Sequence, residues 1–84
     1  MQISVDISLY PLQGEYLATI QNFIEMLKNQ PNIDVVCNEL STQIHGDYHI
    51  IMDLLKKEIY EVFEQIPHSV FAIKLIGNNR KGIL

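Results

Sequence analysis

The N-terminal segment of this chain alternates between apolar and polar side chains with a period of two. Its apolar positions are Ile3, Val5, Ile7 and Leu9. Its polar positions are Gln2, Ser4, Asp6, Ser8 and Tyr10. This alternation predicts a β-strand from Gln2 to Tyr10 with one apolar face. Because a strand buries such a face only against other elements, the rest of the chain must supply partners and a cover.

Two segments have the spacing of amphipathic helices, with apolar residues three and four positions apart. The first runs from Glu15 to Gln30, and its apolar positions are Leu17, Ile20, Phe23, Ile24 and Leu27. The second runs from Tyr48 to Gln65, and its apolar positions are Ile51, Leu54, Leu55, Ile59, Val62 and Phe63. Asp47 is a suitable N-cap for the second helix. Its polar side is predicted to carry Lys56, Lys57, Glu58, Glu61 and Glu64.

Three more strands follow from alternation and from turn residues. The first runs from Ile33 to Asn38, with Cys37 as a small buried hydrophobe. After a turn over residues 39–41, Thr42 to His45 form a short strand that ends at Gly46. The run from His68 to Ile76 is the last strand, and residues 77–84 are expected to be a loose tail.

The resulting order is β-α-β-β-α-β in 84 residues, which is enough for one domain. The simplest packing is an α+β ferredoxin-like plait: a four-stranded antiparallel sheet with two helices on one face. We expect a single domain over residues 1–84, with an ordered core over about residues 2–76.

The other face of this sheet is predicted to be open. In the last strand Phe71, Ile73 and Leu75 face the helices, so the open face receives Val70, Ala72, Lys74 and Ile76. Apolar side chains on an open sheet favour a partner surface. We therefore expect a homodimer or homotetramer formed by sheet packing.

Composition excludes several partners. The formal net charge is −4, so no positive field attracts nucleic acid. The single cysteine forms no internal disulfide, and no Cys/His spacing suits a metal, which favours a reducing cytoplasm. The chain has no secretory signal and no apolar run of membrane-spanning length, so we expect neither export nor membrane insertion.

Two motifs resemble those of the thiamine/hydroxymethylpyrimidine-binding (YkoF-type) family. One is Ser8-Leu9-Tyr10-Pro11-Leu12 at the end of the first strand. The other is Leu40-Ser41-Thr42-Gln43-Ile44-His45-Gly46-Asp47 before the second helix. The likeness extends from about residue 3 to residue 76. It implies a ferredoxin-like fold, association into dimers or tetramers, binding of thiamine or its hydroxymethylpyrimidine half, no enzymatic activity and no cofactor.

The motifs supply groups that suit such a ligand. Thiamine has an aminopyrimidine edge, flat faces and a cationic thiazolium, so it needs short polar groups, an aromatic ring and an anion. The candidate ligand-binding residues are Ser8, Tyr10, Pro11, Asn38, Ser41, Thr42 and His45. Position 45 departs from the family, whose members carry Glu or Arg there. The available anions are Asp6, Glu39 and Asp47.

Each candidate also has a purely structural interpretation. Tyr10 can cover the end of the sheet, and Ser41 and Thr42 can bond their own backbone. His45 can be an ordinary polar strand residue. No catalytic constellation is present, and the strand from Thr42 to His45 lacks the aromatic residues of RNA-binding plaits. The alternative function is a regulatory amino-acid-sensing ferredoxin-like module that acts through oligomerisation.

Overall fold

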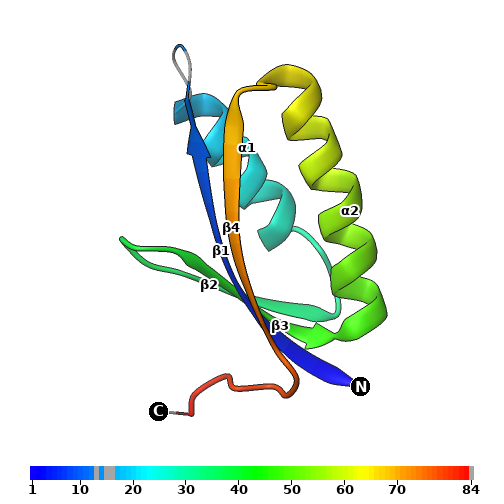
Figure 1. The fold of residues 1–84 in the computed structure, drawn as a ribbon. Helices are drawn as coiled ribbons and strands as arrows, with labels where there is room; N and C mark the ends of the chain where they lie inside the picture. Colours follow the sequence, from blue (N-terminus) through cyan, green and yellow to red (C-terminus); the bar gives the residue numbers. More distant parts are fainter. Residues whose placement is uncertain (13, 15–16, 84) are drawn as a thin grey trace.

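The computed structural model describes residues 1–12, 14 and 17–83. Its elements follow the predicted order: β1 (Gln2–Pro11), α1 (Leu17–Lys28), β2 (Ile33–Cys37), β3 (Thr42–Asp47), α2 (Tyr48–Gln65) and β4 (Ser69–Ile76). The four strands form one antiparallel sheet in the order β2-β3-β1-β4. Both helices lie on the same side of this sheet (Figure 1). The predicted ferredoxin-like α+β fold is confirmed.

The core lies between the helices and the apolar face of the central strands. Ile3, Val5 and Ile7 of β1 are buried there, as the alternation predicted. Ile44 and Ile51 are fully buried beside them. Because each such side chain contributes about 1.5–3 kcal/mol when removed from water, this single layer of contacts holds the helices against the sheet.

The register places the polar side chains of β1 in rows across the open face. Ser4 lies opposite His45 of β3 and opposite Ile76 of β4. Asp6 lies opposite Gln43 and Lys74 in the next row. The open face is therefore polar along its centre, and β4 adds apolar side chains along one edge.

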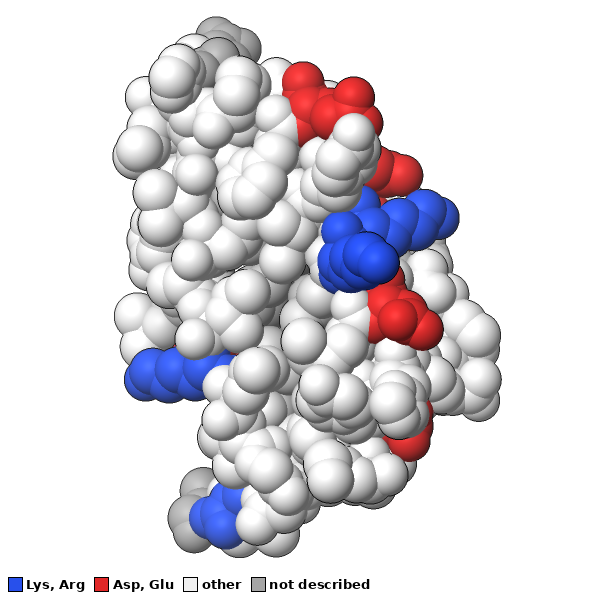
Figure 2. All heavy atoms as spheres, turned by 45° about the vertical axis from the view of Figure 1, so that its right-hand side comes forward, with Lys and Arg blue, Asp and Glu red and all other residues white. Residues whose placement is uncertain are grey.

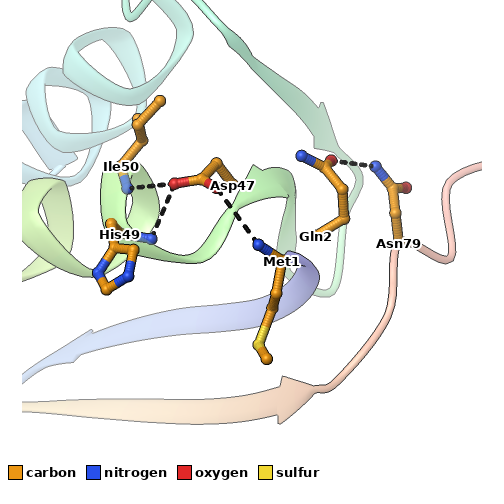
Figure 3. A network of polar contacts seen from close by, with 6 residues as sticks. All are labelled: Met1, Gln2, Asp47, His49, Ile50 and Asn79. Atoms are coloured by element: carbon orange, nitrogen blue, oxygen red, sulfur yellow. Dashed lines mark hydrogen bonds and ion pairs between the residues drawn. The ribbon is translucent and has the colours of Figure 1, made fainter.

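Helix α2 begins where its cap predicts. The Asp47 carboxylate accepts hydrogen bonds from the backbone N–H groups of His49 at 3.0 Å and Ile50 at 3.2 Å (Figure 3). The bond from Ile50 is the main reason that the pKa of Asp47 lies below its usual value. The Met1 amino group lies 3.7 Å from the same carboxylate. These contacts join the start of α2 to the start of β1.

Several predicted boundaries differ from the structure. The predicted start of the first helix at Glu15 lies outside the described residues, and the helix ends at Lys28, before the predicted Gln30. The Gln30 N–H bonds to the carbonyl of Leu27 at 3.2 Å, so the last turn tightens ahead of Pro31. Strand β3 extends through Asp47, which pairs with Gln2, and does not end at His45.

Two predictions about burial are wrong. Cys37 is exposed because it lies at the end of β2, an edge strand. Glu58 is buried because it stands four residues after Leu54 and four before Val62, inside the apolar stripe of α2. Ile73 and Leu75 lie on the helix side of β4, as predicted, and they are exposed because β4 is the other edge strand.

Residues 77–83 turn back across the open face of the sheet (Figure 1). The Arg80 N–H donates to the Ser4 hydroxyl at 2.7 Å, and the Lys81 ammonium lies 3.2 Å from the Asp34 carboxylate. The side-chain amide of Asn79 donates to that of Gln2 at 3.1 Å (Figure 3). This segment therefore contacts the open face at the end formed by Gln2, Ser4 and Asp34. Over the described residues, neither helix is both long and apolar enough to cross a membrane.

Candidate functional site

The end of β1 extends beyond its neighbour β3. Pairing with β3 stops at Ile7, which lies opposite Thr42, whereas pairing with β4 continues to Pro11. Residues 8–11 therefore have a strand neighbour on one side only. The turn between β2 and β3 lies on the other side, where the Ser8 hydroxyl donates to the carbonyl of Leu40 at 3.4 Å.

The turn is held by Asn38. Its side-chain oxygen accepts from the N–H groups of Leu40 at 2.9 Å and Ser41 at 3.0 Å. Its backbone N–H bonds to the Ser41 carbonyl at 3.1 Å, and its amide nitrogen donates to Gln43 at 3.3 Å. Short local bonds of this kind hold a turn in one conformation. Asn38 thus fixes the position of Leu40 and Ser41.

Two hollows meet at this turn. The smaller one has a volume of about 210 Å³ and lies between the end of β1, α1 and the turn. The larger one has a volume of about 650 Å³ and lies on the open sheet face. The two hollows share four of their lining residues: Ser8, Tyr10, Leu40 and Ser41. The two hollows therefore lie on either side of the same residues, and we treat them together as the candidate site.

Asp6 is the anionic group of the larger hollow. Its carboxylate accepts from the Ser41 hydroxyl at 2.5 Å and from the Gln43 amide at 3.1 Å. The bond from Ser41 is the main cause that lowers the pKa of Asp6, and Gln43 and the Lys74 ammonium lower it further. Asp6 therefore stays ionised on the open face. The Gln43 amide also donates to the Ser41 hydroxyl at 2.7 Å, which closes the network.

The structure brings five of the seven sequence-predicted residues together. The smaller hollow is lined by Ser8, Tyr10, Asn38, Ser41 and Thr42. Pro11 pairs with Ser69 at the strand end and lines neither hollow. Asp6 is one of the anions that the sequence offers, but it is not among the predicted ligand-binding residues. Its position two residues before Ser8 places both side chains on the same face of the strand, and this spacing could have identified it.

His45 is separate from both hollows, beneath the segment that follows β4. Its Nδ1 lies 2.8 Å from the Ser4 hydroxyl, which also accepts the Arg80 N–H. The Ser4 hydrogen is thus placed to donate to Nδ1 of a neutral ring. Burial lowers the pKa of His45, the Asp34 carboxylate opposes this effect, and the Lys81 ammonium adds to it. His45 is placed to hold the chain end on the sheet.

The groups of the site suit the binding of a small molecule by charge, hydrogen bonds and stacking. It combines an ionised carboxylate, hydroxyl and amide groups, and the half-exposed ring of Tyr10. Among the described residues, no group of three or more His, Cys, Asp or Glu side chains could hold a metal ion. The fold and this site together define a ferredoxin-like protein with a candidate small-molecule site at the end of its first strand.

The sequence matches the YKOF-related family over residues 2–79. The chain belongs to this family, and the resemblance inferred from its two motifs is confirmed. Membership supports a role in binding a small molecule. No curated protein matches the chain.

Solved structures share the fold at low sequence identity. A Streptococcus pneumoniae protein is 20% identical with a TM-score of 0.85, and the match covers 99% of this chain and 93% of that one. A Thermotoga maritima protein, for which a role in thiamine biosynthesis or salvage has been proposed, is 19% identical with a TM-score of 0.79. That match covers 100% of this chain and 90% of the other. At these identities, the TM-scores show a shared fold alone.

Proposed function

We propose that the protein is a non-enzymatic binder of thiamine or its hydroxymethylpyrimidine half, acting in salvage, delivery or sensing. The observation that carries this proposal is the ionised Asp6 carboxylate in the larger hollow, where Ser41 and Gln43 hold it by hydrogen bonds. An anion beside a groove lined by hydroxyl and amide groups matches a ligand with one flat polar ring and one cationic ring. Family membership supports the same choice.

The two hollows differ in ways that suit the two halves of thiamine. The smaller hollow, of about 210 Å³, holds one ring between α1 and the turn, where Ser8 and Thr42 offer hydroxyl groups. The larger hollow contains the Asp6 carboxylate and receives the thiazolium. Tyr10 lines both, and its ring can stack on either half, a contact worth about 0.5–2 kcal/mol for a cation.

The protein is proposed to have no catalytic activity and no further cofactor, and to act in the cytoplasm. We also propose that a second copy packs on the open sheet face. Val70 and Ile76 of β4 are exposed on that face, and the exposed Tyr10 lies opposite Val70. Light scattering at micromolar protein tests this association. A mass of two or four chains supports it, and the mass of one chain contradicts it.

Calorimetry with thiamine, hydroxymethylpyrimidine and a panel of amino acids tests the ligand. We expect saturable heats with thiamine or the pyrimidine at millimolar concentration or below. Binding of an amino acid alone would contradict the proposal and favour the alternative of an amino-acid-sensing module.

The substitution Asp6→Asn tests which half of thiamine Asp6 contacts. Because the attraction between two opposite charges about 4 Å apart is about 1 kcal/mol in water and about 4 kcal/mol near a protein surface, loss of the Asp6 charge should weaken thiamine binding roughly tenfold or more. The neutral hydroxymethylpyrimidine should lose much less affinity. Asp34→Asn is the matched control, because Asp34 is on the open-face side of β2 but lines neither hollow. Equal losses for both ligands in Asp6→Asn would contradict the assignment of the cation to Asp6.

A further inference from the structure

Glu58 is a buried carboxylic acid outside the candidate ligand site. Its side chain is on α2, and the residue is only 3% exposed. Its Oε1 atom has no hydrogen-bond partner among the described residues. An unpaired carboxylate in such surroundings is costly, so it must take up a proton or a positively charged neighbour.

Glu58 also lines a small hollow of about 100 Å³ between α1 and α2. The lining includes four more residues whose side chains carry oxygen atoms: Thr19, Asn22, Glu61 and Gln65. The ring of Phe23 and other apolar side chains complete the wall. The hollow therefore combines carboxylates, neutral acceptors and an aromatic face in a space that admits only a small group.

We propose that this hollow binds a primary alkylammonium group, either on a free amine or at the end of a lysine side chain. A primary ammonium has three N–H donors, which match the oxygen atoms of the lining, and its alkyl stem suits the wall around Phe23. The carboxylates of Glu58 and Glu61 disfavour an anion. Among the described residues no cluster suits a metal ion, and a quaternary ammonium has no N–H group to donate to the carboxylates.

Glu58 and Glu61 bring two carboxylates to the hollow, and the Lys57 ammonium is near enough to act on Glu58. Burial and the neighbouring Glu61 carboxylate raise the pKa of Glu58, while the Lys57 ammonium lowers it. Figure 2 turns the α2 side of the molecule forward and shows acidic and basic groups close together within a largely uncharged surface. A bound ammonium at the hollow would hold Glu58 ionised and lower its pKa.

NMR of the Glu58 carboxyl carbon tests this inference. At ten times its dissociation constant, n-butylammonium chloride should lower the apparent pKa of Glu58 by about one pH unit. Tetramethylammonium chloride at equal ionic strength should not. Nα-acetyl-lysine amide separates the two sources: a shift with it assigns the site to lysine side chains as well, and a shift with n-butylammonium alone assigns it to free amines.

Variants test the same inference without titrating Glu58. Glu58→Gln keeps the side-chain volume and should abolish the line broadening of n-butylammonium proton signals. Glu64→Gln is the matched control on the same helix, because Glu64 is exposed and does not line the hollow. Equal effects of the two cations on Glu58, no effect of either amine, or unchanged amine binding by Glu58→Gln would overturn the proposal.

Discussion

His45 and Glu58 are buried residues whose ionised forms are disfavoured by their surroundings. Burial lowers the pKa of His45 and raises the pKa of Glu58. The two groups therefore make stability depend on pH in opposite directions. Neither could be predicted from sequence. His45 is covered by residues far along the chain, and Glu58 lies among charged neighbours that hide its place on the apolar stripe.

The neutral His45 ring should make the fold sensitive to acid. Since its pKa is lowered in the folded state, the unfolded chain binds a proton more readily below pH 6.5. Stability is lost as the pH falls from that value toward the lower folded pKa. We expect urea unfolding to show a larger loss between about pH 7.5 and 5.5 for the natural chain than for His45→Gln. Parallel losses would argue against this role of His45.

Glu58 should have the opposite effect. Because its pKa is raised in the folded state, it lowers stability as the pH rises above its usual value of 4.5. Glu58→Met should stabilise the fold at neutral pH by on the order of 1–3 kcal/mol, since it removes an unpaired buried acceptor. The gain should shrink on acidification. Glu64→Met, at an exposed position of the same helix, should change little in the same urea titrations.

At the scale of elements, hydrophobic periodicity and caps located the helices and strands. Asp47 and the spacing that follows it predicted α2 from Tyr48 to Gln65, as the structure has it. β3 was predicted too short, because Gly46 resembles a turn residue in sequence. In the sheet Gly46 instead pairs with Ile3 and Ile33. Its lack of a side chain serves a close approach between strands, which sequence alone does not reveal.

Gly46→Ala should therefore destabilise the sheet. An added Cβ atom would lie 3.1 Å from the Ile33 side chain and 3.3 Å from the Asn32 carbonyl oxygen. Overpacking of this kind costs about 1–3 kcal/mol. Gly77→Ala is the control, because nothing lies within 4 Å of its added Cβ atom. Thermal unfolding of the two variants should differ clearly, and equal midpoints would contradict the tight contact at Gly46.

At the scale of the whole molecule, antiparallel pairing explains why much of the candidate site was predictable. Once β1 pairs with β3, the end of one strand and the start of the other must meet, so Ser8 and Ser41 come together. The order of the motifs was sufficient for that inference. The bond from Ser41 to Asp6 and the contact of Arg80 with Ser4 depend on three-dimensional register and on the path of the chain end. Neither leaves a local sequence pattern.

Thiamine or its pyrimidine half is proposed to bind in the two hollows beside the β2–β3 turn. The most direct test is an NMR titration of the isotope-labelled chain with thiamine, following every backbone amide. We predict that the largest shifts fall on Ser8, Tyr10 and residues 38–42, which line the smaller hollow. The backbone amides around Glu58, at the hollow between α1 and α2, should not shift. Absence of shifts, or shifts centred away from the β2–β3 turn, would contradict the proposed ligand site.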